Sequence, residues 1–125
     1  MRLLLDTHVL LWWLADDPSL EKDAKAAITD PTSAVFVSAA TAWEIAIKQA
    51  LGKLEAPSDL EHQLQLNRFE PLSISIAHAY TAGTLPRHHD DHFDRMLVAQ
   101  ALAEGLTIVT RDPRLDHYGV AMVSA

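Results

Sequence analysis

Short apolar runs alternate along the chain with longer segments in which apolar residues recur every three or four positions. The short runs predict buried β-strands, and the longer segments predict helices with one apolar face. The expected strands are Arg2–Leu5, Ala34–Val37, Phe69–Ile74, Leu106–Thr110 and Val120–Val123. Phe69–Ile74 contains Pro71, which places it at an edge of the sheet because proline donates no hydrogen bond to a neighbouring strand.

Helices are expected between these strands, bounded by polar residues that suit helix starts and glycines that suit helix ends. The expected helices are His8–Ala15, a segment capped by Ser19 and running through Ala27, Ala39–Leu51 between Ser38 and Gly52, Asp59–Leu66, Ile76–Ala82, and His92–Glu104 between Asp91 and Gly105. Helices that alternate with buried strands predict an α/β fold in which a parallel sheet is covered on both faces.

The composition is that of an ordinary globular domain. With 125 residues, 49% of them hydrophobic and 22% charged, the chain suits one domain spanning residues 1–125. It has no cysteine, which excludes disulfides and thiolate metal sites and fits a cytoplasmic location. No apolar run approaches the roughly 18 residues of a membrane span, so no membrane association is expected. The formal charge of −7 argues against a nucleic-acid substrate unless something local offsets it.

Two aspartates follow predicted strands. Asp6 comes directly after Arg2–Leu5, and Asp112 comes just after Leu106–Thr110. Both therefore lie at the carboxyl edge of the parallel sheet, where ligand sites form. Each also has a simpler explanation as a turn residue or a helix cap, because aspartate is common in both places.

Two further acids lie on the packed faces of helices. Asp94 shares a face with Leu97 and Val98, so it heads the side that should be buried, where an unpaired charge is costly. Glu44 borders the packed side of Ala39–Leu51, although an exposed ion pair with Lys48 explains it equally well.

These four acids are expected to converge. A helix that precedes or follows a parallel strand runs back against it, so its early turns lie at the carboxyl edge of the sheet. Asp6, Glu44, Asp94 and Asp112 can then surround one crevice. Carboxylates suit hard cations such as Mg²⁺ or Mn²⁺, which activate water for attack on a phosphodiester. Bound metal would also offset part of the negative charge where phosphate binds.

Four segments of this chain resemble a PIN-domain ribonuclease, and most of all the VapC-type toxins of bacterial toxin–antitoxin modules. They are Asp6-Thr7-His8, Ser38 through Trp43-Glu44-Ile45, His92-Phe93-Asp94-Arg95-Met96 through Ala99-Gln100-Ala101, and Thr110-Arg111-Asp112. The resemblance covers nearly the whole chain in the expected order. One departure is His92, where relatives commonly have proline; the four acids are intact.

The resemblance implies a three-layer α/β/α fold with a parallel sheet of strand order 3-2-1-4-5. It implies that Asp6, Glu44, Asp94 and Asp112 bind Mg²⁺ or Mn²⁺ and activate water to cut RNA. It also implies neutralisation by a cognate antitoxin protein, and a homodimer.

Other residues beside the acids have both functional and structural interpretations. Thr7 and Thr110 are candidates to support the acids by hydrogen bonding, or are turn residues. The candidate RNA contacts are Arg87, Arg95, Arg111 and Arg114, which solvated faces explain as well. His88, His89 and His92 favour a solvated, phosphate-facing loop over a zinc site. Leu10–Leu14 is apolar on every side, which core packing or a partner interface would explain.

Two competing functions remain. An aspartyl-phosphate phosphatase would use Asp6 as its nucleophile, but Asp6-Thr7-His8 lacks the second acid usual two residues later, and no active-site lysine is evident. A catalytically inert binding module would share the fold without the chemistry, and the intact acid set argues against it. The sequence does not reveal the RNA target or the antitoxin.

Overall fold

Five parallel strands form one sheet in the computed structural model, which describes residues 1–125. The strands are β1 (Arg2–Leu5), β2 (Ala34–Ser38), β3 (Glu70–Leu72), β4 (Thr107–Thr110) and β5 (Met122–Ser124). Their order is β3-β2-β1-β4-β5, and each neighbouring pair is parallel. The expected order is therefore confirmed, with the proline-containing β3 at an edge.

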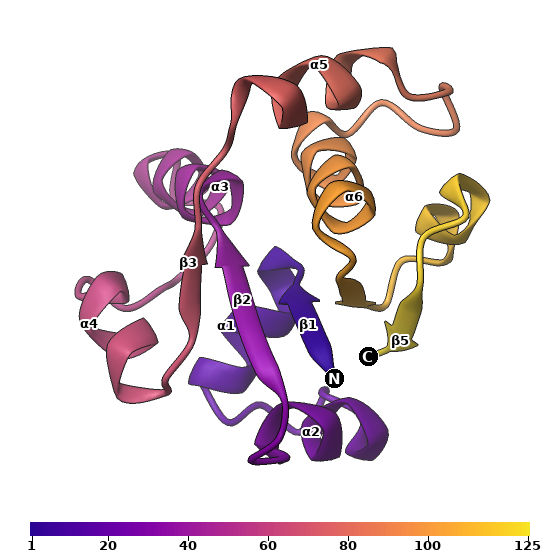
Figure 1. Ribbon diagram of the computed structural model, residues 1–125. Coiled ribbons are helices and arrows are strands. Elements are labelled where there is room, and N and C mark those ends of the chain that lie inside the picture. The colour runs from indigo at the N-terminus through magenta and orange to yellow at the C-terminus, as the bar shows by residue number, and fades with distance from the viewer.

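Helices connect the strands, as Figure 1 shows. They are α1 (Thr7–Leu14), α2 (Lys22–Thr29), α3 (Ala39–Ala50), α4 (Leu60–Leu66), α5 (Ile76–Thr84), α6 (His92–Glu104) and the 3-10 helix η1 (Pro113–Tyr118). Ser38 and Asp91 cap α3 and α6 as expected. Gly105 ends α6 at a φ of +66°, a left-handed conformation that glycine adopts without strain.

The sheet is buried on both faces because successive side chains of each strand point in opposite directions. Leu3 and Leu5 belong to a cluster with residues of α1, α2 and α3, whereas Leu4 belongs to a second cluster with Leu97 and Val98 of α6. All three leucines of β1 are fully buried. The sheet therefore lies between two layers of helices, as in a three-layer α/β/α fold. Its central strand β1 is followed directly by Asp6 at the carboxyl edge.

Several expected bounds shift by a few residues. α2 begins at Lys22 rather than near Ser19, whose side chain does not cap it, and extends to Thr29. β5 begins at Met122, two residues after the expected start. The 3-10 helix after Asp112 was not expected, because its six residues are too few to show a hydrophobic repeat.

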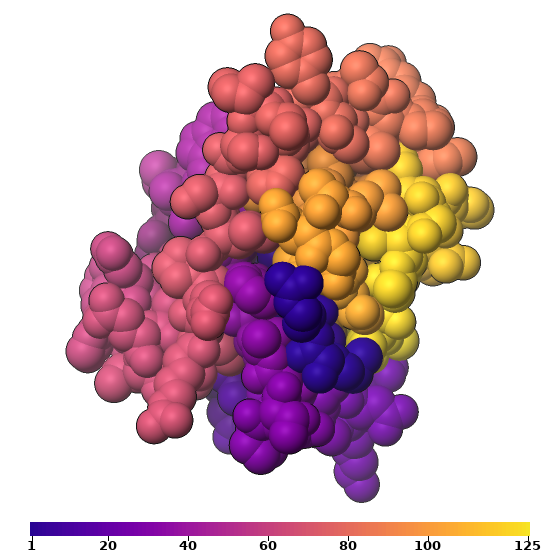
Figure 2. Space-filling view, viewed as in Figure 1, coloured from indigo at the N-terminus to yellow at the C-terminus, as the bar shows by residue number.

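Segments far apart in the sequence form one continuous surface. Figure 2 shows the first residues (indigo) lying between the β2 region and α6. Here Arg2 donates a hydrogen bond to the carbonyl of Glu104 at 2.7 Å, and its guanidinium lies 5.6 Å from the centre of the Phe36 ring. None of the helices has the length and apolar character needed to cross a membrane.

Candidate active site

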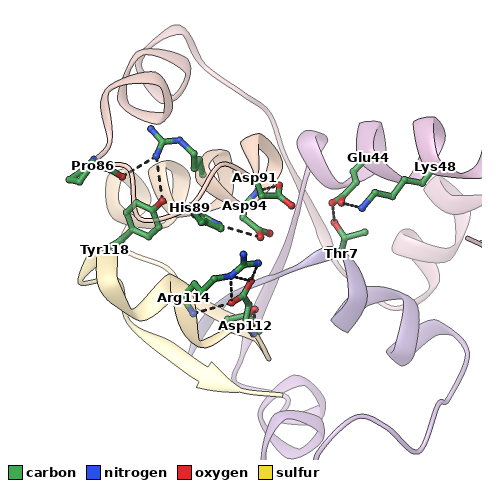
Figure 3. A network of polar contacts seen from close by, with 12 residues as sticks. Thr7, Glu44, Lys48, Pro86, His89, Asp91, Asp94, Asp112, Arg114 and Tyr118 are labelled. Carbon is green, nitrogen blue, oxygen red and sulfur yellow. Dashed lines mark hydrogen bonds and ion pairs between the residues drawn. The ribbon is translucent and has the colours of Figure 1, made fainter. Parts of the chain in front are cut away.

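A crevice with a cavity of about 460 Å³ lies at the carboxyl edge of the sheet. It is lined by Asp6, Thr7, His8, Trp12, Glu44, Lys48, Asp91, Asp94, Arg111, Asp112, Pro113 and Arg114. The four acids singled out from the sequence are therefore brought together, from β1, α3, α6 and the end of β4. Figure 3 shows Glu44, with Thr7 and Lys48, facing Asp94 and Asp112 across the crevice.

Asp6 serves as both a helix cap and a crevice residue. Its Oδ1 accepts a hydrogen bond from the backbone N–H of Val9 at 2.9 Å, which begins α1, and the residue is 8% exposed. The pKa of Asp6 is raised above its ordinary value, mainly because the carboxyl is buried. The charge of Glu44 acts in the same direction, whereas hydrogen bonds from Thr110 and Val9 act against it. These hydrogen bonds orient the Asp6 carboxylate in the wall of the crevice.

Glu44 is buried, although the sequence left open that it was an exposed partner of Lys48. The ion pair is present, with Nζ of Lys48 at 2.6 Å from Oε2, but Glu44 is only 5% exposed. The hydroxyl of Thr7 donates a hydrogen bond to Oε1, so both carboxylate oxygens have partners. Lys48 therefore lines the crevice as well, beside Glu44.

Asp94 has the most perturbed acidity in the crevice. Its side chain is 20% exposed. Burial, and after it the charges of Asp91, Asp6, Glu44 and Asp112, together raise its pKa from 3.8 to about 7. Asp91, by contrast, caps α6 by accepting a hydrogen bond from the backbone N–H of Asp94 at 3.0 Å. Burial and four neighbouring carboxylates therefore make the charged form of Asp94 unfavourable, which is typical of functional sites.

Asp112 is paired with an arginine. Its Oδ2 lies 2.6 Å from Nη2 of Arg114, and its Oδ1 lies 3.0 Å from Nε, which makes a two-point contact. This hydrogen-bonded guanidinium holds the pKa of Asp112 below its usual value. The hydroxyl of Thr110 accepts the backbone N–H of Asp112 at 3.1 Å, so Thr110 supports Asp112 as well as Asp6.

The four candidate arginines separate into two groups. Arg111 and Arg114 line the crevice, and the guanidinium of Arg111 lies 4.2 Å from the centre of the Trp12 ring. Arg95 does not fit the expectation of an RNA contact, because it is 6% exposed and turns inward. It donates hydrogen bonds to the carbonyls of Ala82, Leu85 and Pro86. Arg87 is exposed near Asp90 and lies outside the crevice.

The histidine-rich loop is only partly solvated. His88 and His92 are exposed, but the side chain of His89 is 3% exposed and packs against Tyr118. The expectation of a wholly solvated loop is therefore wrong for His89. Tyr118 was missed too, because its contact with His89 joins residues 29 positions apart, and no local pattern records that contact.

The crevice suits a hydrated cation. Nowhere in the chain do three or more His, Asp or Glu side chains lie close enough together to hold a metal ion by themselves. Mg²⁺, however, keeps several of its waters and is commonly bound through one or two carboxylates. The all-oxygen set and the raised pKa of Asp94 fit a divalent cation of this kind, because its charge would stabilise the ionised acids.

The family model described as "PIN domain" matches residues 3–121. The chain belongs to the PIN-domain family. This PIN domain is 32% identical to Ribonuclease VapC22 of Mycobacterium tuberculosis (strain ATCC 25618 / H37Rv) over 118 residues, which cover 92% of the chain and 90% of the relative. It is 37% identical to Ribonuclease VapC16 of the same organism over 71 residues, which cover 52% of the chain and 50% of the relative.

Solved structures share the fold of this PIN domain. The VapBC2 structure from Rickettsia felis, bound to a promoter DNA fragment, superposes with a TM-score of 0.72 at 16% identity and covers 100% of this chain and 99% of that chain. The VapBC-1 structure from nontypeable Haemophilus influenzae gives a TM-score of 0.71 at 18% identity, with coverage of 99% and 98%. At this identity the likeness concerns the fold.

Proposed function

We propose that this PIN domain is a metal-dependent endoribonuclease that acts in the cytoplasm as the toxin of a toxin–antitoxin system. The observation that carries the proposal is the crevice in which Asp6, Glu44, Asp94 and Asp112 meet, with the pKa of Asp94 raised to about 7. The homology to mycobacterial VapC ribonucleases supports the choice of RNA as substrate. The single domain spans residues 1–125.

The acids have distinct tasks in this proposal. Mg²⁺ or Mn²⁺, held by the four carboxylates in part through water, would supply a Lewis acid and an activated water. Asp6 and Glu44 are fixed in place by hydrogen bonds from Val9 and Thr7, so they offer oxygens at set positions. Asp94 is the acid most sensitive to added positive charge, because its ionised form is the least favourable without it.

The basic residues of the crevice suit the RNA backbone. Lys48 and Arg114 line the same cavity as the acids, so they can contact phosphates beside the scissile bond. Arg111 lines it too, but its guanidinium already donates hydrogen bonds to the carbonyls of Ser19 and Ala125. Together with a bound metal, these basic residues would make the place where RNA binds less negative than the formal charge of −7 for the whole chain. Arg95 has no such role, because its guanidinium is committed to backbone carbonyls.

A purified-protein assay tests the proposal. Transfer, ribosomal and messenger RNAs are incubated with the protein in Mg²⁺, in Mn²⁺ and in EDTA, and the ends of the products are mapped. We expect internal cleavage with either metal, none in EDTA, and none by the Asp94→Asn variant. Absence of metal-dependent cleavage across all three RNA classes would contradict the enzyme and favour an inert binding module.

The protein partners proposed are a small antitoxin and a second copy of the chain. The solved relatives include VapBC complexes, which supports an antitoxin. Leu10 is fully buried in the core, whereas Leu11 and Leu14 line a shallow cavity of about 290 Å³ beside Pro57. We place the antitoxin over this part of α1, a helix whose residues Thr7, His8 and Trp12 line the crevice.

Growth measurements test the antitoxin contact. Leu14→Gln and Leu11→Gln are expressed with and without the cognate antitoxin, and an exposed substitution on another surface, Glu61→Gln, is the control. We expect the folded α1 variants to escape neutralisation and to remain toxic. If the antitoxin fully neutralises both variants, the proposed antitoxin interface on α1 is wrong. Light scattering of the purified chain measures whether it forms a homodimer.

A further inference from the structure

His89 is a buried histidine with one unsatisfied ring nitrogen. It lies in the loop between α5 and α6, and its Nδ1 lies 2.7 Å from the hydroxyl of Tyr118. Its Nε2 is buried without a hydrogen-bond partner, and Oδ2 of Asp94 lies 3.5 Å away. Figure 3 shows the imidazole between Tyr118 and Asp94. A buried N–H without a partner is costly, so this arrangement calls for an explanation.

The neighbours of Tyr118 determine which nitrogen carries the proton in the neutral ring. Arg95 places Nη1 at 3.4 Å from the tyrosine oxygen, and a guanidinium only donates hydrogen bonds. The tyrosine oxygen therefore accepts from Arg95, and Nδ1 of His89 is the protein acceptor within reach of the hydroxyl hydrogen, so this hydrogen is donated to Nδ1. With Nδ1 acting as acceptor, the proton of the neutral imidazole lies on Nε2 and points at Asp94.

We propose that His89 is a positioning residue that orients the Asp94 carboxylate for metal binding, and that Tyr118 and Arg95 hold it in the required tautomer. The role of Asp94 in this statement rests on the proposed function. The Asp94 side chain makes no hydrogen bond, and His89 is the one group at ion-pair distance from it, so His89 is placed to orient the carboxylate. When His89 engages Oδ2, the other oxygen is left for a ligand in the crevice.

The separation of 3.5 Å is longer than an ordinary hydrogen bond. A contact of this kind can shorten when a bound ligand draws the two groups together. Arg95, which contacts Tyr118, is itself fixed in place because its guanidinium donates hydrogen bonds to three backbone carbonyls. In other proteins, removing a side chain that hydrogen-bonds to a metal ligand typically lowers metal affinity by about 10- to 100-fold.

Four variants test the role. His89→Leu removes the donor, and Tyr118→Phe removes only the hydroxyl that fixes the tautomer. His89→Gln keeps an N–H near the position of Nε2 and should rescue part of the effect. His88→Gln is the matched control, since His88 also packs on the Tyr118 ring, at 4.8 Å between ring centres, but is exposed. Melts in EDTA verify that each variant folds.

Mn²⁺ affinity, measured by electron paramagnetic resonance without RNA, is the first measurement. We expect it to fall about tenfold or more in His89→Leu, less in Tyr118→Phe and His89→Gln, and not at all in His88→Gln. Nitrogen-15 spectra of the histidines should show the Nε2–H tautomer for His89. In cleavage assays kcat should fall with little change in KM.

The proposal is overturned if His89→Leu and Tyr118→Phe bind Mn²⁺ as tightly as the parent, or if His89 carries its proton on Nδ1. Should His89→Leu fail to fold, Tyr118→Phe and the tautomer decide. If the parent binds Mn²⁺ but cuts no RNA, the proposed function fails while the affinity comparison still tests His89.

Discussion

Replacing Asp94 by asparagine should stabilise the metal-free protein while abolishing cleavage. The pKa of Asp94 is 3.8 in an ordinary setting and about 7 in the fold, mainly because of burial and then because of the neighbouring acids. The folded protein therefore binds more protons than the unfolded chain between these pH values. Its free energy of unfolding then falls as the pH rises from about 4 to about 7.

The size of the effect follows from the two pKa values. One pKa unit corresponds to about 1.4 kcal/mol, so the ionised Asp94 costs the fold about 4 kcal/mol above pH 7. The asparagine variant avoids this cost but loses the attraction between a carboxylate and the amino end of α6, about 0.3–1 kcal/mol. We expect a net gain of about 3 kcal/mol at pH 7.5, and almost none at pH 4.

Urea unfolding of both proteins at pH 4, 6 and 7.5, in EDTA and in excess Mn²⁺, measures these quantities. Metal at about a hundredfold excess over its Kd should stabilise the parent by about 2.7 kcal/mol, and the variant by less. Asp90→Asn is the matched control, because it makes the same charge change at a side chain that is 87% exposed. Asp90→Asn should alter neither the pH dependence of the free energy of unfolding nor the stabilisation by Mn²⁺.

The reasoning is refuted if Asp94→Asn keeps the parent's pH dependence and its full gain from Mn²⁺. Asp94 would then be a residue of the first helical turn without a share in the acid cluster. A variant that still cuts RNA would refute the proposed role of Asp94 in catalysis.

Three further substitutions test the roles of the arginines. Arg95→Met should lower the free energy of unfolding by about 2–4 kcal/mol, because three backbone carbonyls lose a charged donor. The control Arg87→Met should change it by less than about 0.5 kcal/mol. Equal melting temperatures for the two variants would contradict the structural role of Arg95. Arg114→Ala should tighten Mn²⁺ binding, because the cation paired with Asp112 is gone, yet slow single-turnover cleavage by removing a phosphate contact; weaker Mn²⁺ binding would contradict this.

The local sequence was sufficient to predict the layers of the fold and the meeting of the four acids. Strand positions follow from short apolar runs, and an acid placed directly after a parallel strand must lie at the carboxyl edge. Asp6 and Asp112 are of this kind. Asp94 and Glu44 could be placed because the starts of the connecting helices return to the same edge. The strand order itself came from the resemblance to PIN domains, because periodicity carries no information about which strands are neighbours.

Tertiary structure alone decided where the other polar side chains point and how the acids titrate. Arg95 directly follows Asp94 in the sequence, yet it faces the carbonyls at the end of α5 because α5 packs on α6. His89 meets Tyr118 only because η1 folds against the loop before α6. The pKa of Asp94 depends on burial and on charges from three other parts of the chain. Side-chain direction and desolvation depend on contacts between distant segments, which no local pattern encodes.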